Sequence, residues 1–134
     1  MKAFITLFVA CLVATALAGR VELNDEQKLK AKQHIEECVK QENVPEEDVV
    51  KFRNKDITNP SRAFKCLSTC FFERAGTLKN GELQNEVVVA KLGGLIGVEK
   101  AKEALEKCKG IKTDDRCETG YKTVECFHAA NAPY

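Results

Sequence analysis

The chain has 134 residues, with 21 basic and 20 acidic side chains and a formal net charge of +1. This balance gives no support for a nucleic-acid partner or an anionic membrane surface, because both require a basic excess. The length fits one small domain.

Residues 1–18 have the features of a secretory signal peptide. Lys2 supplies a positive charge, residues 3–18 form an uninterrupted run of low polarity, and Ala16-Leu17-Ala18 is a small-residue cleavage signal. The apolar run is shorter than the roughly 20 residues that span a bilayer. We therefore expect residues 1–18 to be cleaved, and residues 19–134 to form one exported, soluble domain without stable membrane insertion.

Six cysteines remain once Cys11 leaves with the signal peptide, at positions 38, 66, 70, 108, 117 and 126. An even number in a short secreted chain indicates three disulfides. Each would stabilise the fold by about 2–4 kcal/mol. With that support, a small domain could tolerate an unfilled internal cavity.

The first helix is expected over residues 25–42, because Asn24 is a favourable N-cap and apolar residues then recur at helical spacing. A short second helix follows Pro45 and ends near Phe52. The polar residues 54–59 form a loop that leads to the central helix.

The central helix is expected over residues 60–76. Asn59 is a good N-cap, Pro60 suits the first helical position, and Gly76 suits a C-cap. Opposite its two cysteines, one face carries residues that we expect to turn toward core or cavity: Phe64, Ser68, Phe71 and Ala75.

Three more helices complete the predicted pattern. Asn80-Gly81 predicts a turn before residues 82–96, the most apolar part of the exported chain. We expect a helix there that is buried nearly all round, because no other segment offers a partner strand for its valines. Amphipathic helices over residues 98–110 and 115–128 follow, which gives six helices and no sheet.

Helical geometry limits how the cysteines pair. Cys66 and Cys70 lie one turn apart, where Cβ atoms are about 5–6 Å from each other instead of the about 3.8 Å of a disulfide. Cys117 and Cys126 point to opposite sides of the last helix. Of the 15 pairings of six cysteines, about ten remain open after these two exclusions.

The cysteine spacing C-x27-C-x3-C-x37-C-x8-C-x8-C resembles that of the insect odorant-binding proteins, the pheromone and general odorant-binding family. The stretch from Cys70 to Leu83 is similar to the fly branch of that family. The resemblance implies a compact all-α single domain, with six helices and three interlocked disulfides around an apolar cavity. It also implies a pairing that is among those still open: Cys38–Cys70, Cys66–Cys117 and Cys108–Cys126.

The sequence offers little for catalysis. Its only histidines are His34 and His128, its only serines in the exported chain are Ser61 and Ser68, and no serine-hydrolase or zinc-protease motif occurs. The cysteines are too widely spaced for a zinc site. We expect no enzyme, no catalytic residue, no metal and no cofactor, and we expect His34 to lie on a solvated helix face.

The expected function is a secreted carrier of small hydrophobic ligands such as odorants, fatty acids and related aliphatic lipids. Few aromatic residues and many aliphatic ones favour a pocket for a flexible hydrocarbon chain. Each predicted pocket residue could equally belong to closed core. They are Phe64, Ser68, Phe71, Leu83, Val87, Val88, Leu92, Leu95, Leu105, Tyr121, Val124 and Phe127.

Polar groups would set the class of ligand. The hydroxyls of Ser68 and Tyr121 could bond a head group, although the Ser68 hydroxyl could instead bond a carbonyl of its own helix. A carboxylate ligand would gain from a basic side chain, for which Arg53, Arg62 and Arg74 are candidates.

The tail after Cys126 could act as a lid, as it does in some members of the family, with His128 and Tyr134 as candidate residues. Protonation of His128 near pH 5–6 would then loosen the lid. The alternative is a frayed, exposed terminus.

Two further functions stay open. One is a scavenger of amines or lipid mediators in saliva or haemolymph, which would need inward carboxylates such as Glu73 or Glu86. The other is presentation of the carrier to a chemosensory receptor. The compartment would be extracellular (sensillar lymph, saliva or haemolymph), and the protein would be a monomer or weak dimer.

Overall fold

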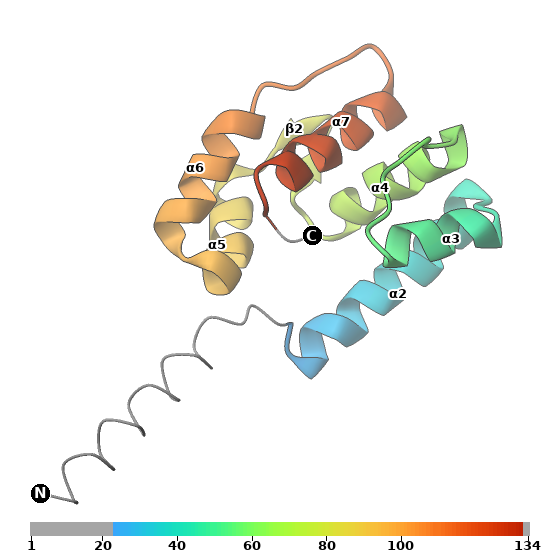
Figure 1. Ribbon diagram of the computed structural model, residues 1–134, viewed down its shortest axis with the longest axis horizontal. Coiled ribbons are helices and arrows are strands. Elements are labelled where there is room, and N and C mark those ends of the chain that lie inside the picture. Colours follow the sequence, from blue (N-terminus) through green and yellow to red (C-terminus); the bar gives the residue numbers. More distant parts are fainter. Residues whose placement is uncertain (1–22, 133–134) are drawn as a thin grey trace, which may run out of the picture.

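The computed structural model describes residues 23–132, so the predicted signal peptide and Tyr134 lie outside the described residues. Six helices and one short hairpin are present in that part of the chain (Figure 1). The elements are α2 (Asp25–Glu42), α3 (Glu46–Arg53), α4 (Arg62–Arg74), β1 (Leu78–Lys79), β2 (Glu82–Leu83), α5 (Asn85–Ile96), α6 (Val98–Cys108) and α7 (Arg116–Ala129). The predicted six-helix, all-α class is confirmed.

The central helix α4 begins later than predicted. The side chain of Ser61 accepts a hydrogen bond from the backbone N–H of Phe64 at 3.0 Å, so Ser61 is the N-cap. Asn59 cannot take that role, because its φ of 46° is left-handed and an N-cap needs extended backbone. At the other end Gly76, with φ 79°, follows the C-cap Ala75 and ends the helix.

The segment expected to start a helix at residue 82 forms a strand instead. Asn80 and Gly81 both have left-handed φ, 52° and 79°, as a two-residue type I′ hairpin turn requires. This turn pairs β1 with β2 in antiparallel register, with Leu78 opposite Leu83. The prediction of no sheet was wrong here because each strand is only two residues long, too short to give a period.

Helix α5 is less buried than predicted. Only Val88 and Leu92 of this helix are buried. Figure 1 shows α5 and α6 side by side at one edge of the molecule, so α5 uses part of its apolar surface against α6. One face of α5 borders a cavity, described below.

Three disulfides tie the helices together, and their pairs are those that the resemblance implied. Cys38–Cys70 joins α2 to α4, Cys66–Cys117 joins α4 to α7, and Cys108–Cys126 joins α6 to α7. The Cα–Cα distances are 5.7, 4.5 and 5.6 Å in that order. Helix α4 is therefore bonded to two neighbours, and a chain of bridges links four of the helices.

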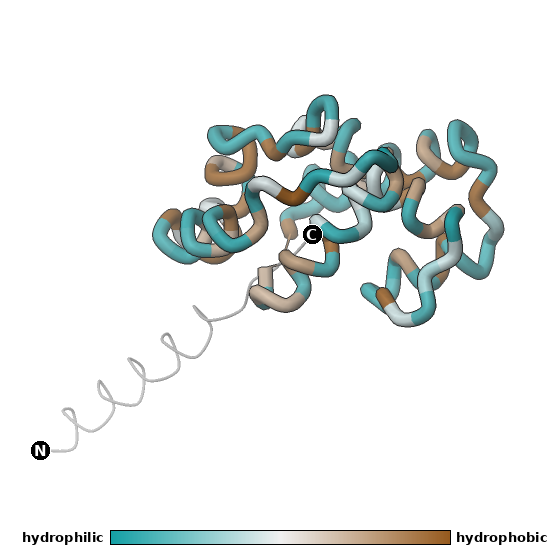
Figure 2. Tube along the Cα trace, turned by 90° about the horizontal axis from the view of Figure 1, so that it is seen from above, coloured by the Kyte–Doolittle hydropathy of each residue, from teal (hydrophilic) through white to brown (hydrophobic). Residues whose placement is uncertain are grey.

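The buried apolar residues form two main groups instead of one core. The first is shared by α2, α3, α4 and α7 and includes Phe52, Phe64 and Leu67. The second joins α5, α6 and α7 and includes Leu92 and Leu105. Figure 2 shows hydrophobic residues recurring between hydrophilic ones along the helices, as amphipathic packing requires. Within residues 23–132, no helix has both the length and the apolar character to cross a bilayer.

Candidate functional site

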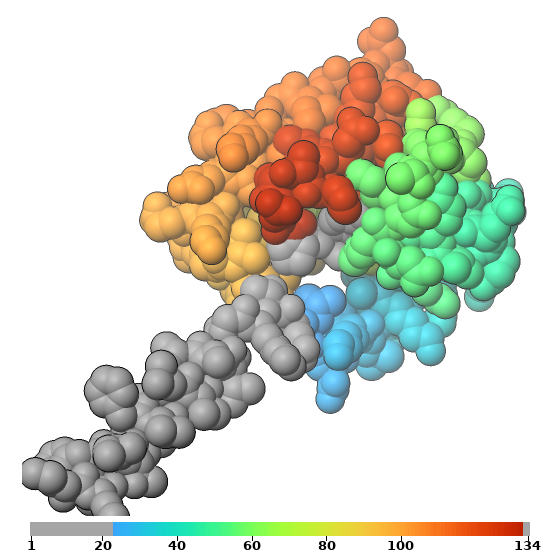
Figure 3. Space-filling view, in the orientation of Figure 1, coloured from blue at the N-terminus to red at the C-terminus, as the bar shows by residue number. Residues whose placement is uncertain are grey.

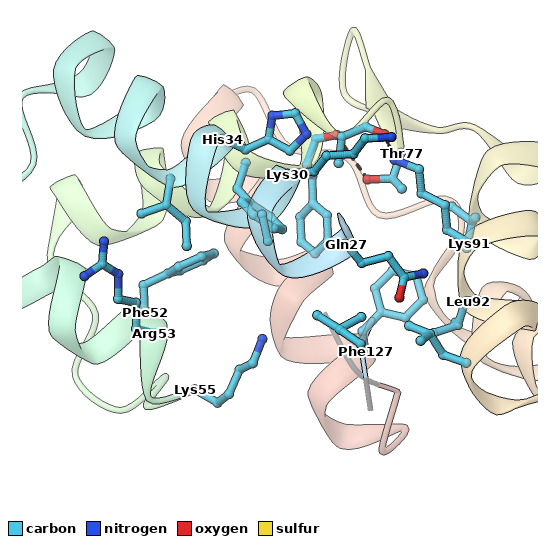
Figure 4. Close-up of a pocket in the computed structure, with 18 residues that line it drawn as sticks. Gln27, Lys30, His34, Phe52, Arg53, Lys55, Thr77, Lys91, Leu92 and Phe127 are labelled. Carbon is cyan, nitrogen blue, oxygen red and sulfur yellow. Dashed lines mark hydrogen bonds between the residues drawn. The ribbon is translucent and has the colours of Figure 1, made fainter. Parts of the chain in front are cut away.

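A cavity of about 490 Å³ lies between the two apolar groups. Its volume falls within the about 300–1,000 Å³ that is typical of pockets for small ligands. In the space-filling view, α2 lies below the body formed by the later helices, and the molecule is hollowed between them (Figure 3). The lining residues are Leu23, Gln27, Lys30, Ala31, His34, Ile35, Phe52, Arg53, Lys55, Phe71, Phe72, Ala75, Thr77, Val88, Lys91, Leu92, Leu95 and Phe127 (Figure 4).

Four phenylalanines form a continuous aromatic wall of the cavity. The ring centroid of Phe71 lies 5.3 Å from that of Phe52 and 6.0 Å from that of Phe72. The ring of Phe72 lies 6.5 Å from that of Phe127. The cavity is thus more aromatic than the sequence suggested, because most of the phenylalanines gather along one wall. Such a surface gives a large apolar contact area for a ligand.

Some of the predicted pocket residues line this cavity and others do not. The lining includes Phe71, Val88, Leu92, Leu95 and Phe127. The residues outside the lining are Phe64, Ser68, Leu83, Val87, Leu105, Tyr121 and Val124. Phe64, for example, packs its ring against those of Phe52 and Tyr121, at 6.0 and 6.3 Å. Phe64, Ser68 and Phe71 share one face of α4, but only the C-terminal half of that face borders the cavity.

The two hydroxyls considered for a ligand head group are engaged within the protein. The buried Ser68 donates to the backbone carbonyl of Phe64 at 2.9 Å. Tyr121 donates to the backbone carbonyl of Ile57 at 3.0 Å. Both hydroxyls therefore stabilise the fold in this structure, Ser68 within α4 and Tyr121 between α7 and the loop that follows α3.

Of the three candidate arginines, only Arg53 borders the cavity. Arg62 forms an ion pair with Asp115. Arg74 forms one with Glu37 at 2.6 Å. Sequence alone could not separate these roles, because the pairing acids, Asp115 before α7 and Glu37 in α2, lie far away along the chain.

One wall of the cavity was missed in the sequence reasoning. Helix α2 and the residue before its cap contribute Leu23, Gln27, Lys30, Ala31, His34 and Ile35. These residues recur at intervals of three or four, which is the signal of one helix face. The sequence reasoning assigned the polar members of this stripe to a solvated surface, and for His34 that prediction was wrong because its side chain is partly buried at the cavity.

The charged residues in the lining have one sign. They are Lys30, Arg53, Lys55 and Lys91, together with the titratable His34. None of the described residues that line the cavity is acidic. Burial lowers the pKa of the Lys55 amine, and burial followed by the nearby Lys30 lowers that of Lys91. Each shift means that protein surroundings disfavour the bare cation, so an anionic group in the cavity would be stabilised by them.

His34 sits where α2 meets the aromatic wall. Its ring lies edge-on to Phe71 with centroids 6.1 Å apart. Burial and then Lys91 lower its pKa below the ordinary 6.5; Glu37 opposes this, and Arg74 and Lys30 add smaller lowering effects. His34 is therefore neutral at pH 7, and protonating it is harder in the folded state than in the unfolded one.

Replacing His34 by glutamine is expected to reduce the loss of stability on acidification. The unfolded chain takes up a proton near pH 6.5 and the folded chain only at lower pH, so wild type loses stability as pH falls through this window. Urea denaturation of both proteins at about pH 7.5 and about pH 5 measures the difference. An equal loss in both proteins would show that His34 is as easily protonated in the folded state as in the unfolded one.

The predicted lid residues do not line the cavity in the described part of the chain. His128 is an exposed residue in the last turn of α7, and Tyr134 lies outside the described residues. The acids considered for an amine ligand lie elsewhere too. Glu73 is paired with Arg116, Nε to Oε2 being 3.1 Å, and Glu86 is exposed in the first turn of α5. The lid stays a prediction.

Comparison with known proteins gives consistent matches. Residues 20–130 match the model of the PBP/GOBP family. General odorant-binding protein 56a of Drosophila melanogaster is 47% identical over 126 residues, covering 94% of this chain and 91% of the relative.

Solved structures match over most of the chain as well. The fatty acid binding protein OBP56a from the oral disk of the blowfly Phormia regina has 56% sequence identity and a TM-score of 0.77, covering 84% of this chain and 97% of that one. Odorant-binding protein dmelOBP28a of Drosophila melanogaster has 26% identity and a TM-score of 0.69, covering 78% and 92%. The arrangement of the helices is therefore shared with proteins that are named for the binding of odorants or fatty acids.

Proposed function

The chain belongs to the PBP/GOBP family, and from that premise we propose that it is a secreted carrier of small hydrophobic molecules, with long-chain fatty acids as its preferred ligands. The name of the blowfly relative, a fatty acid binding protein with 56% identity, supports this class of ligand. The proposed site is the cavity between the two apolar groups.

The observation that carries the proposal is an apolar cavity whose charged lining residues, among those that the structure describes, are all basic. An alkyl chain against the aromatic wall would gain about 0.8 kcal/mol for each buried methylene. A carboxylate would gain charge-assisted hydrogen bonds from a lysine or arginine at the cavity. Together the two features suit a long-chain acid better than a neutral odorant.

A scavenger of biogenic amines is the second candidate, and the charges of the cavity argue against it. An ammonium ligand needs a carboxylate or an aromatic cage to replace its water. The cavity offers phenylalanines, but its described lining has several cations and no acid, so a cationic ligand would be repelled. Lipid mediators that carry a carboxylate remain compatible with the same site.

The role as carrier needs no catalytic residue, cofactor or metal. We propose that residues 1–18 are removed as a signal peptide and that residues 19–134 act outside the cell. The lid at His128 and Tyr134, a chemosensory receptor as partner, and a monomer or weak dimer stay predictions.

Competition for a fluorescent apolar probe tests the proposed ligand class. Refolded residues 19–134 would be titrated with palmitic acid, methyl palmitate and a biogenic amine. We expect the acid to displace the probe at least about tenfold more effectively than its ester, because only the acid can form a charge-assisted hydrogen bond. The amine should not compete.

Shorter acids provide an internal check on the same titration. Each methylene removed should weaken binding by roughly fourfold as long as the chain still lies in the cavity. Equal competition by acid and ester would indicate a general carrier of apolar odorants. Displacement by the amine alone, or no probe binding at all, would rule out the fatty-acid carrier.

A further inference from the structure

With one exception, the described residues that have a left-handed backbone conformation are glycines or asparagines. Among the described residues, four glycines have positive φ, and five other residues share that left-handed conformation. Four of those five are asparagines, at positions 43, 59, 80 and 131. The fifth is Lys55, with φ 59°. Glycine and asparagine tolerate this conformation, whereas a lysine at such a position is held there against its preference.

The conformation of Lys55 is imposed by the end of α3. The N–H of Lys55 donates to the carbonyl of Phe52 at 3.2 Å, and the N–H of Asp56 donates to that of Lys51 at 2.9 Å. These two bonds form a Schellman motif, which places its left-handed residue at Lys55. Glycine is the usual residue there. Nothing about ending a helix calls for a lysine at this position.

The loop that carries Lys55 is also fixed from the other side. Tyr121 on α7 donates a hydrogen bond to the carbonyl of Ile57, 64 residues away in sequence. The loop therefore keeps one orientation relative to the cavity, and so does the direction in which the side chain of Lys55 leaves the backbone.

That direction is into the cavity. Figure 4 shows the amine of Lys55 pointing toward the interior of the pocket, whereas the guanidinium of its neighbour Arg53 turns outward. Lys55 is exposed to solvent, yet burial of part of its side chain against the surrounding protein lowers the pKa of its amine. The protein thus keeps a cation in an unfavourable backbone conformation and in partly desolvated surroundings at the cavity.

We propose that Lys55 is the specificity-determining residue of the cavity, whose amine binds the carboxylate of an aliphatic acid. The inference rests on the proposed function and adds the residue that reads the head group. It predicts an acid with its carboxylate at the end of α3 and its alkyl chain along the phenylalanine wall. A neutral ester of the same chain would occupy the wall without this contact.

Other cations of the lining are the rival anchors. Lys30 and His34 lie on α2 and Lys91 on α5, on a different side of the pocket from Lys55 in Figure 4. All have ordinary helical backbone, so none of them carries a conformational penalty that calls for a functional reason.

Lys55→Gly tests the proposal, because it should move affinity and stability in opposite directions. We expect the variant to bind palmitic acid about 10- to 100-fold more weakly, since a hydrogen bond to a charged group is lost. Binding of methyl palmitate should change less than about twofold. The thermal midpoint should rise by a few degrees, since the left-handed strain and the desolvated charge are removed together.

Three further variants serve as comparisons for Lys55→Gly. Lys55→Arg keeps a cation and should keep most of the preference for acid over ester. Asn43→Gly changes another left-handed residue away from the cavity and should leave both affinities unaltered. Lys91→Met removes a rival cation and should reduce the preference much less than Lys55→Gly.

The outcomes separate this inference from the proposed function. If wild type prefers the acid and Lys55→Gly still does, the carrier function stands and Lys55 is not the anchor. If Lys91→Met lost the preference for acid over ester and Lys55→Gly kept it, the head group would lie at α5 and the proposal would be overturned. Equal binding of acid and ester by wild type also overturns it, and binding of neither would refute the carrier function as well.

Discussion

Replacing Gly120 by alanine is expected to destabilise the fold by about 3 kcal/mol or more, at the upper end of what overpacking does. Gly120 lies in α7, where that helix crosses α4, and a Cβ atom there would stand only 2.6 Å from the Cα of Thr69. The disulfide Cys66–Cys117 holds the same two helices with Cα atoms 4.5 Å apart, so they cannot separate to make room. Denaturant unfolding followed by circular dichroism should show a much lower midpoint.

Gly94→Ala is the matched control, because it adds the same methyl group to another helical glycine. A Cβ at Gly94 would meet no atom within 4 Å. Alanine should stabilise α5 there by about 0.5–1 kcal/mol through its higher helix propensity. If Gly120→Ala had as small an effect as Gly94→Ala, the close approach of α4 and α7 would not be a constraint on the fold.

The sequence predicted the fold well where the signals were local or came from the cysteines. The N-cap predicted at Asn24 is present, in a capping box that Gln27 completes, and α2 occupies the predicted residues. The spacing of the cysteines carried the resemblance, and the family is confirmed. Errors arose where two residues competed for one role. Asn59 and Ser61 are both good N-caps, and only the left-handed backbone of Asn59 decides between them.

The cavity was harder to predict than the helices that enclose it. A residue on an apolar helix face lies either in closed core or in a pocket, and the two have the same periodicity. Ser68 and Phe71 illustrate this, since they share a face of α4 but only Phe71 borders the cavity. The polar residues of α2 that line the cavity were predicted to lie on the protein surface. Because the cavity is open, these residues are partly solvated, and their polar character is the same as that of ordinary surface residues.

The position of a basic side chain relative to the cavity depends on tertiary contacts that no local pattern encodes. Arg53, Arg62 and Arg74 could not be distinguished, and Lys55 was not considered. Its left-handed backbone is a property of how α3 ends. A lysine at the position after a helix end, where glycine is expected, is the one sequence signal that could have indicated it.

Removing the disulfide between α2 and α4 is expected to reduce both stability and ligand affinity. Replacing Cys38 and Cys70 by alanines frees a loop with a sequence separation of 32, which in the loop-entropy model costs about 3.5–4 kcal/mol. Helix α2 provides the wall of the cavity from Gln27 to Ile35. We therefore expect palmitic acid to bind more weakly even under conditions in which the variant is folded, as measured by probe displacement at low temperature.

Replacing Cys108 and Cys126 by alanines is the informative comparison. This bridge has a sequence separation of 18, so its removal should cost nearly as much, about 3 kcal/mol. It fastens α6, which contributes no residue to the described lining of the cavity. The two variants should therefore have similar stability but different affinities for palmitic acid. Only the variant without Cys38–Cys70 should lose much of its affinity. If both lost affinity equally, binding would follow global stability and the attachment of α2 would have no separate role. If neither did, packing against α4 alone would hold α2 in place.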